Sequence, residues 1–407
     1  MHFYTSTGWK GAVVAVLLHA SSAWADDAAP ALSPDRAVAL SLTAHPDLRT
    51  TEVALSTAEA SRSAAALFLS NPSVDAWTTP DAARADLGVS QPLSLTGEGW
   101  HARRGAARSA DSARATLRRA RRELAANVRL AYAEAVVAAG VVGVAREGLD
   151  LAGRLRFGVQ RRHEEGEASA LDLRLARLAE VQAAARLLEA RRREVAALRG
   201  LSSWTLTPVT AADLATDPLV VVPLNSPLDV GQRSDVVAAD AALEAARAGL
   251  RRARAAIVPP LSVGIGAEVE GGAAFVGPSV GLTLPIFDRN QVGRAQASGA
   301  VAVAEGRLAR AEAMAEIERV TSSARLAEAE VAAETVVEGG LEEARAALAS
   351  IEAGVLAGEI DLATAVLLQV QVLEGEAAVF TLRGLLADAH IDRLLALDAD
   401  ALLGGAR

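Results

Sequence analysis

The stretch PPLSVGIGAEVEGGAAFVGPSVGLTLPIF, residues 259–287, decides the fold that this sequence predicts. Its first arm alternates apolar residues such as Val263 and Ile265 with small or polar residues, and the return arm after Gly271-Gly272 follows the same rule. A period of two over about ten residues per arm predicts a β-hairpin with one apolar and one polar face. Such arms are about long enough to cross an outer membrane, where lipid-facing and lumen-facing residues alternate.

The polar side of this hairpin, residues 260–286, is expected to face an aqueous lumen. The lumen-facing positions that we predict are Ser262, Gly264, Gly266, Glu268, Ser279 and Thr283. A second and weaker hairpin is predicted at residues 72–93. Its return arm alternates clearly, whereas its first arm, SVDAWTT, is ambiguous.

Composition indicates that the rest of the chain is helical. Apolar residues make up 51% of the 407 residues, mostly Ala, Leu and Val, and aromatic residues only 3%, which is typical of long packed helices. The net charge of −9 makes a nucleic-acid partner unexpected. The arginine-rich run at residues 103–122 could be a basic patch, but we favour the solvated face of a helix beside acidic neighbours.

Residues 1–25 have the pattern of a secretory signal peptide. Lys10 precedes a short apolar run, and Ala23-Trp24-Ala25 forms a cleavage site of the A-x-A type. The run is too short for a membrane helix, so we expect residues 26–407 to be exported without one. The chain has no cysteine, which excludes a disulfide framework, a thiol nucleophile and a lipid-bearing N-terminal cysteine.

The order of predicted elements repeats once along the chain. A helix of about 70 residues from Thr96 to His163 would be a rod of ~100 Å, and it is followed by a turn at 164–169 and a return helix. The second half has a long helix from Asn290 to Gly354, a turn at 356–361 and a last helix to Leu397. We therefore expect one unit of two repeats, residues 34–199 and 233–397, with a connector at 200–232 and a frayed tail at 398–407.

Two copies of this plan place both β-hairpins at one end of the rod and both helical turns at the other. Four strands cannot close a barrel, and open sheet edges in lipid would leave backbone groups unsatisfied. The membrane end must therefore be completed by further copies of the chain, in a number that this argument leaves open.

These features together resemble the outer membrane efflux protein family, the TolC-like outer-membrane factors, and in particular the branch serving heavy-metal efflux pumps. The resemblance rests on HPDLRTTEVALSTAEA (45–60), RSDVVAADAALEAARAGLRRARAAIVPPLSVGIGAE (233–268) and VGPSVGLTLPIFDRNQVGRAQAS (276–298). It rests also on the two turns, RRHEEGEASALDL (161–173) and GVLAGEIDLATAVL (354–367). Three departures from the family pattern are a short first hairpin, a second turn without an Arg-aromatic pair, and a near absence of girdle aromatics, for which Trp77 and Phe275 are the candidates.

The resemblance implies a mainly α fold with a small β part, in which long coiled-coil hairpins form a tandem repeat and two β-hairpins give four strands to an oligomeric outer-membrane barrel. It implies a homotrimer, a twelve-stranded barrel in outer-membrane lipid and a helical conduit through the periplasm. It further implies docking onto a periplasmic adaptor of the membrane fusion type and an inner-membrane transporter, which we expect to be of the resistance-nodulation-division type.

The two helical turns are the predicted functional sites. The adaptor-docking residues implied by the resemblance are Arg162, His163, Gly166, Glu167, Leu171, Gly358, Glu359 and Leu362. A ring of acidic residues at the mouth of the rod would favour cations, and the candidates for this gate are Glu164, Glu165, Glu167, Glu359 and Asp361. The alternative is that these acids simply cap helix N-termini.

We find no catalytic site, metal site or cofactor motif. The one lysine, Lys10, lies in the signal peptide, and the histidines have no ligand spacing. The first interpretation is a passive outer-membrane exit duct of a tripartite efflux or type I secretion-like system, located in the outer membrane and periplasm. The alternative is a periplasmic coiled-coil scaffold or adaptor that does not insert.

Overall fold

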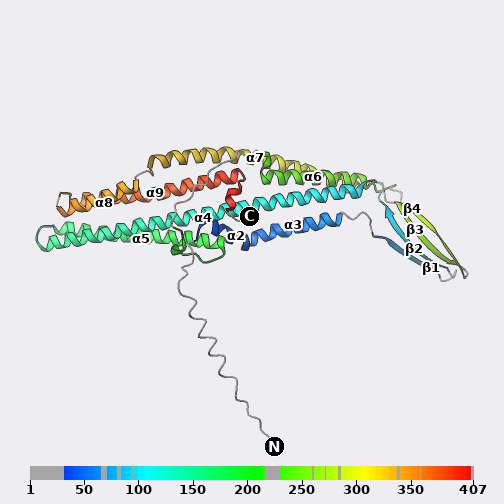
Figure 1. Ribbon diagram of the computed structural model, residues 1–407, viewed down its shortest axis with the longest axis horizontal. Helices are drawn as coiled ribbons and strands as arrows, with labels where there is room; N and C mark the ends of the chain where they lie inside the picture. The colour runs from blue at the N-terminus through cyan, green and yellow to red at the C-terminus, as the bar shows by residue number, and fades with distance from the viewer. Residues whose placement is uncertain are drawn as a thin grey trace, which may run out of the picture.

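The computed structural model describes residues 32–65, 71–79, 84–93, 96–215, 230–258, 261–270, 272–282, 286–336, 340–357 and 359–404. Over these ranges the chain forms an elongated layer of helices with a small β-sheet at one end (Figure 1). The predicted signal peptide and two predicted site residues, Thr283 and Gly358, lie outside the described residues.

The first half of the chain runs from two short helices to the sheet and back. Its elements are α2 (Pro34–Ala44), α3 (Pro46–Ala65), β1 (Ser73–Thr79), β2 (Arg84–Leu93), α4 (Glu98–Glu164) and α5 (Ala170–Thr205). The helix α4 is continuous over 67 residues, so at 1.5 Å per residue it is ~100 Å long and runs through both halves of the layer. The predicted long rod is confirmed.

The second half repeats this order. Its elements are η2 (Ala211–Asp213), η3 (Val230–Gln232), α6 (Ser234–Ala255), β3 (Leu261–Glu270), β4 (Ala273–Leu282), α7 (Gln291–Val336), α8 (Gly340–Ala357), α9 (Leu362–Ala396) and η4 (Asp400–Leu403). We predicted one helix from Asn290 to Gly354, and α7 and α8 cover most of this range on either side of residues 337–339, which lie outside the described residues.

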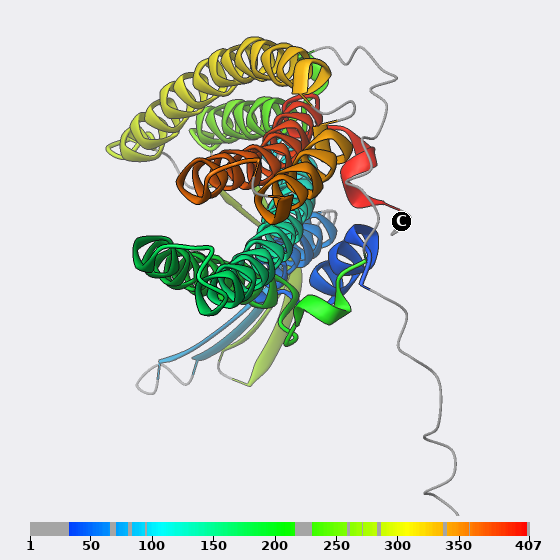
Figure 2. The same cartoon turned by 90° about the vertical axis from the view of Figure 1, so that its left-hand side faces the viewer.

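The helices form a single curved layer (Figure 2). In the half next to the sheet the helices contact one another in the order α3, α4, α6, α7, and in the other half in the order α5, α4, α9, α8. The helices α4 and α9 each contain an 18-residue stretch that is long and apolar enough to cross a membrane by composition alone. Because α4 and α9 pack on one another within the layer, we interpret both as packing helices.

The two hairpins join into one antiparallel sheet with the strand order β1-β2-β3-β4. Val89 of β2 pairs with Ile265 of β3, and Ile265 pairs with Pro278 of β4. This register places apolar residues of all four strands on one face, and glycine, serine and acidic residues on the other. Both predicted hairpins are confirmed, and the β2–β3 pairing joins the two repeats.

The largest hydrophobic core lies at the middle of the rod, where α2, α4, α5 and the end of α9 meet. Leu201 and Leu402 are fully buried there, and the buried Tyr132 hydroxyl donates to the carbonyl of Leu32 at 2.8 Å. The expectation of a frayed tail after Leu397 is wrong for residues 398–404. These residues are held because Leu402 enters the core and because Arg129 Nε donates to the Leu402 carbonyl at 2.9 Å.

Glycines on α4 allow α9 to approach closely. A Cβ at Gly140 would lie 2.4 Å from a ring carbon of Phe380, and a Cβ at Gly148 would lie 2.7 Å from a methyl group of Leu373. Gly143, one turn from Gly140, has open space around it. A close approach between α4 and α9 therefore occurs at two of these three glycines.

Replacing Gly140 by Ala should destabilise the protein by about 1–3 kcal/mol, because the new methyl group collides with the Phe380 ring. Replacing Gly143 by Ala should leave stability unchanged or raise it by up to ~1 kcal/mol, since alanine is the better helix former and meets nothing there. Urea unfolding in detergent, followed by far-ultraviolet circular dichroism, measures both. Two variants of equal stability would contradict the packing.

Candidate functional site

The first helical turn is built by hydrogen bonds around a glycine. Gly166 has a φ of 83°, which only glycine adopts readily, and Glu167 N donates to the Arg162 carbonyl at 2.7 Å. Ser169 caps α5 and forms a capping box with Asp172. Nδ1 of His163 lies 2.8 Å from the carbonyl oxygen of Ala168, so this nitrogen is the donor. The predicted residues Arg162, His163 and Gly166 thus shape the turn.

The second turn is closed in a different way. Asp361 is the N-cap of α9: its carboxylate accepts from the Thr364 backbone N–H at 3.0 Å and from the Thr364 hydroxyl at 2.5 Å. These bonds, first that of the hydroxyl, lower the pKa of Asp361. Gly354 leaves room for the Ile360 side chain, and Glu359 N donates to the Gly354 carbonyl at 2.9 Å.

The two turns lie together at one end of the rod and contact one another (Figure 1). Arg162 Nη1 of the first donates to the Val355 carbonyl beside the second at 3.3 Å. Leu362 packs between Val159 and Ala176 and is only 7% exposed. Leu362 therefore joins the two helical hairpins in this conformation, whereas Leu171, also a predicted docking residue, is exposed.

All five predicted gate acids are exposed at this end, but four have partners. Glu165 pairs with Arg161 at 3.3 Å and Glu167 with Arg162 at 3.9 Å. Glu164 accepts from Gln160, and Asp361 caps α9. Among the described residues, Glu359 is the gate acid without a side-chain partner.

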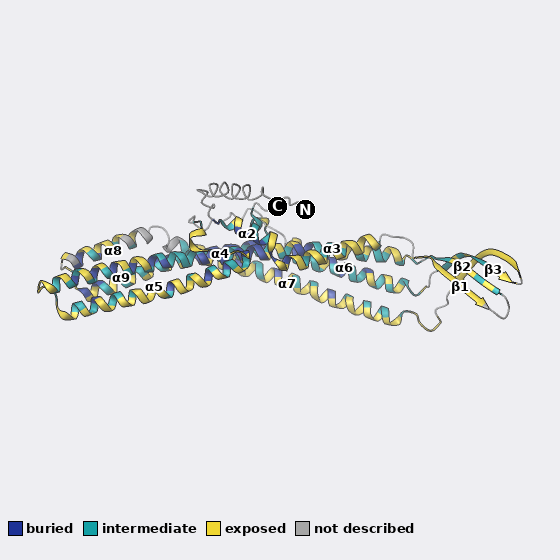
Figure 3. Ribbon diagram, turned by 90° about the horizontal axis from the view of Figure 1, so that it is seen from below, coloured by how far each residue is buried: buried dark blue, intermediate teal, exposed yellow. Residues whose placement is uncertain are grey.

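The predicted lumen-facing residues of the strands share one face of the sheet. Ser262, Gly264, Gly266 and Glu268 alternate along β3, and Ser279 of β4 pairs with Gly264. A hollow of about 1000 Å³ lies over this face, lined among others by Ser262, Gly266, Glu268 and Ser279. Apolar residues such as Ile265 and Val276 alternate with these residues along the strands and are 64% and 73% exposed (Figure 3 shows the exposed strands).

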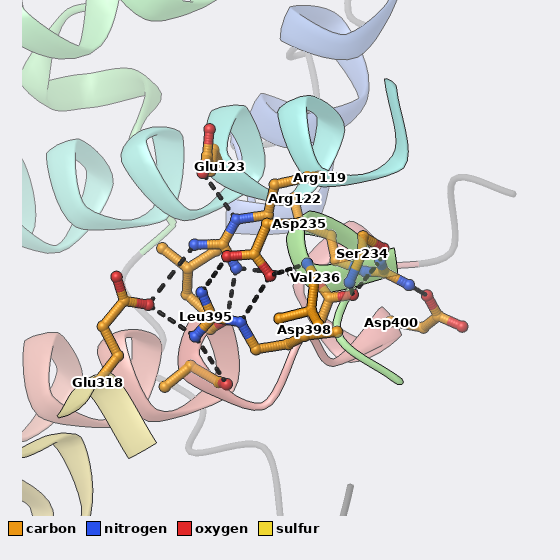
Figure 4. A network of polar contacts seen from close by, with 12 residues as sticks. Arg119, Arg122, Glu123, Ser234, Asp235, Val236, Glu318, Leu395, Asp398 and Asp400 are labelled. Carbon is orange, nitrogen blue, oxygen red and sulfur yellow. Dashed lines mark hydrogen bonds and ion pairs between the residues drawn. The ribbon is translucent and has the colours of Figure 1, made fainter. Parts of the chain in front are cut away.

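Sequence reasoning missed a buried polar network in the middle of the rod, drawn in Figure 4. Asp398 accepts hydrogen bonds of 2.8 Å from Arg122 Nη1 and from the backbone N–H of Ser234. Arg122 also donates to Asp400 at 2.6 Å, and Arg119 donates to the Leu395 carbonyl at 3.0 Å. The network thus ties the end of α9 to α4 and to the start of α6.

Arg233 supplies a second buried charge beside this network. Its side chain is 3% exposed, pairs with Asp235 and donates to Glu318 at 2.7 Å. Burial alone would lower the pKa of Arg233, but the hydrogen bonds to the two carboxylates outweigh burial and raise it. The guanidinium is buried and held by two carboxylates that reach it from the protein, so we assign this cluster to structure.

The interpretation of residues 103–122 as a solvated helix face is therefore correct only in part. Arg114 and Arg121 form exposed pairs with Glu59 and Glu52. The side chains of Arg119 and Arg122 are only 11% exposed and are held in the network, so the interpretation is wrong for them. One feature of the sequence pointed to this part of the network: Arg233-Ser234-Asp235 occupies the place in the second repeat that His45-Pro46-Asp47 occupies in the first.

The two repeats make equivalent contacts at this level. The His45 ring stacks on the ring of Trp204 with 5.6 Å between centroids, at the end of α5. Arg233 Nη1 donates to the carbonyl of Ala396 at 3.4 Å, at the end of α9. Arg233 stands 188 residues after His45, as Pro260 does after Pro72 at the start of the hairpins. Ala396 stands 192 residues after Trp204, as Gly358 does after Gly166 in the sequence of the two turns.

One acid on α9 has a raised pKa. The pKa of Asp388 on α9 is raised to about 6, chiefly by burial, and the charges of Asp392 and Glu134 add to the effect. In the part of the chain that the structure describes, no three or more His, Asp or Glu side chains are grouped as metal ligands would be.

Replacing Asp388 by Asn should stabilise the protein by about 1–2 kcal/mol at pH 8 and leave it almost unchanged below pH 3.8. The sign follows because a folded-state pKa above the unfolded value, 3.8, makes the ionised form destabilising in the fold. That cost is absent below 3.8 and fully present above about 6. Urea unfolding across this pH range is the measurement, with exposed Asp240→Asn as control. A loss of stability at pH 8 would contradict the assignment.

We compared the sequence and the fold with those of known proteins. The sequence model of the family described as outer membrane efflux protein matches residues 38–205. No curated protein matches the chain. The description of this family names outer-membrane efflux, which agrees with the expectation that the chain is not an enzyme.

Several solved structures share the fold over nearly their whole length. A membrane protein from Pseudomonas aeruginosa is 21% identical with a TM-score of 0.74, over 89% of this chain and 93% of that one. The outer membrane protein VceC from Vibrio cholerae is 17% identical with a TM-score of 0.72, over 90% and 96%. The MtrE outer membrane channel of Neisseria gonorrhoeae is 19% identical with a TM-score of 0.69, over 90% and 89%. The chain has the fold of these membrane proteins. Through residues 38–205 its resemblance to the outer membrane efflux protein family is confirmed.

Proposed function

We propose that this protein is a passive outer-membrane exit duct of a tripartite efflux or secretion-like system. The observation that carries the proposal is the four-stranded sheet, which has one exposed apolar face, one polar face over a hollow, and two open edges. The family match at residues 38–205 and the shared channel fold support it. The duct would lie in the outer membrane and extend through the periplasm.

The apolar face of the sheet is suited to lipid. Leu87, Ile265, Val276 and Val280 come from three strands, and all are more than half exposed. An exposed apolar surface of this kind is uncommon on a soluble monomer and marks contact with a membrane or a protein. Alternation with the polar face is the pattern of an outer-membrane barrel strand.

The open edges call for further copies of the chain, and we infer a homotrimer with a twelve-stranded barrel. Within the described residues no strand pairs with the outer edge of β1 or of β4. In lipid these edges would leave N–H and C=O groups without partners. A ring of copies closes the sheet without leaving an edge.

The edges of the helical layer also lack partners. Exposed apolar residues follow a heptad-like spacing along α5: Leu171, Leu178, Val181, Leu188 and Val195. In the half next to the sheet, the edge helix α7 carries a second set of exposed apolar residues that includes Val303, Met314 and Ile317. In addition, α5 has more arginines than acids whereas α8 has more acids than arginines. Opposite charges on the two edges favour head-to-tail contacts between copies in a ring.

We further propose that the helical turns dock a periplasmic adaptor and, through it, an inner-membrane transporter of the resistance-nodulation-division type. The exposed residues offered there are Glu167, Leu171 and Glu359, His163 is half-buried beside them, and Leu362 supports them from within. A scaffold that never inserts is the competing function. The exposed apolar face of the sheet and the two equivalent helical hairpins favour the duct over it.

Two neighbouring substitutions on β3 separate the duct from the scaffold. Ile265→Arg puts a charge on the apolar face and should cost ~2–4 kcal/mol per chain at the bilayer midplane, which prevents stable insertion. Gly266→Arg puts the same charge on the polar face and should insert normally. Carbonate and urea extraction of outer membranes measures both variants.

The scaffold makes the opposite prediction for this experiment. If the unaltered protein is released by carbonate, or if both variants stay in the membrane equally, the apolar face does not contact lipid and the duct is excluded.

The acidic gate is best tested at Glu359 because it is exposed and unpaired among the described residues. Glu359→Lys should lower the preference for cations, which the reversal potential in a planar bilayer at low salt reports. Asp361→Asn removes a charge but keeps the N-cap, so it should act in the same direction without unfolding the turn. Asp240→Lys, far from the turns on α6, is the control. Unchanged reversal potentials for both turn variants would show that the turns do not set selectivity.

A further inference from the structure

The bulky side chains of the sheet's polar face gather in one cross-strand row. Trp77 of β1 pairs with Asp86 of β2, Asp86 pairs with Glu268 of β3, and Glu268 pairs with Phe275 of β4. We call these four residues the aromatic–acidic row. It lies toward the hairpin turns, at the end of the sheet away from the helices (Figure 1).

The next row toward the helices is almost bare. It holds Asp75, Gly88, Gly266 and Gly277. The three glycines have no side chains, so the polar face is open at this row. At the aromatic–acidic row the larger side chains fill part of the space above the polar face. The change from small to large side chains therefore falls at one level on the polar face.

The two aromatic residues are on the wrong face for a lipid girdle. We expected Trp77 and Phe275 to be girdle candidates, and girdle aromatics of outer-membrane barrels point outward at the membrane interface. The register instead places both on the face that carries Glu268 and Ser279. Their side chains are 63% and 62% exposed, so they do not fill a core within the chain.

The acidic residues of the row are held in place by one arginine. Arg84 Nη2 lies 2.8 Å from Glu268 Oε1, and Arg84 Nε lies 3.3 Å from Asp86 Oδ2. All three side chains remain about one third exposed. With Asp75 and Glu270 on the same face, the described acids outnumber this arginine, so the face is negative overall.

These groups line the hollow of about 1000 Å³, which is large enough for a drug-sized molecule. Indole and phenyl faces attract cations, and carboxylates beside them add a direct charge interaction. An inorganic ion would use only the carboxylates, whereas an organic cation with an apolar body would use both. We propose that the aromatic–acidic row is a binding site for organic cations on their way out of the duct, an inference that rests on the proposed function.

Block of single channels by tetraphenylphosphonium tests the site. With the purified protein in planar bilayers, the cation added on the side of the sheet should reduce the current, and the anion tetraphenylborate should not. Trp77→Ala and Phe275→Ala should each raise the half-blocking concentration by about tenfold, from loss of the ring contact. Trp77→Phe keeps a ring and should retain most of the block. Trp100→Ala, an exposed tryptophan at the start of α4, is the matched control.

The outcomes separate the site from the duct. Channels that conduct normally but are blocked equally in the wild-type, Trp77→Ala and Phe275→Ala proteins overturn the site and leave the duct standing. Channels that tetraphenylphosphonium does not block overturn the site as well. A wild-type protein that forms no channel overturns the duct and the site together.

Discussion

Everything in this structure depends on a sheet that cannot satisfy its own edges. The two hairpins give four strands, and the pairing of β2 with β3 joins them, but β1 and β4 each keep an outer edge without a partner in the described chain. One face is apolar and exposed, so the sheet is stable only in a medium that accepts apolar side chains. Such a medium forbids unpaired backbone groups. The two requirements are met together when copies of the chain close a ring in a membrane.

The helical layer, like the sheet, has edges that are not covered within the described chain. Its helices contact one another in a line, and the edge helices α5 and α7 expose apolar residues that a neighbouring copy could cover. The layer itself is fastened at its middle, where the network around Asp398 and Arg233 joins α4, α6 and α9. Each repeat has a fixed contact at the middle of the rod. In the first repeat it is the stacking of His45 on Trp204, and in the second it is the buried charge of Arg233. The ends of the rod are therefore the parts least constrained within the chain, and they are the parts to which we assign function.

Local patterns were enough to predict the elements but not their long-range contacts. The period of two in β3 and β4 is set by adjacent residues, and the left-handed Gly166 is fixed by its own turn, so both could be read from the sequence. The partners of Arg122 could not be predicted, because Asp398 is 276 residues away in the sequence. A run of arginines also has the same sequence pattern whether its helix face is exposed to solvent or buried. The order of the tail after Leu397 depends on the same contacts, which explains why it was missed.

The candidate sites show the same division. The turn residues were found because acids and glycines cluster visibly in the sequence, but only the fold shows that Leu362 is buried between hairpins and that Asp361 serves as a cap. The place of Trp77 beside Asp86, Glu268 and Phe275 follows from strand register, which single arms do not specify. The finer resemblance, to the heavy-metal branch, stays a prediction.

The most direct measurement of the central claim uses the absence of natural cysteine, which makes single labels unambiguous. Val276 and Gly277 are neighbours on β4 and belong to opposite faces of the sheet. In proteoliposomes, Val276→Cys should be shielded from a water-soluble maleimide and a fluorophore on it should be quenched by lipid-borne quenchers, whereas Gly277→Cys should react freely. Equal reaction of both cysteines with the maleimide would contradict the account, and so would a purified protein that remains a monomer without detergent.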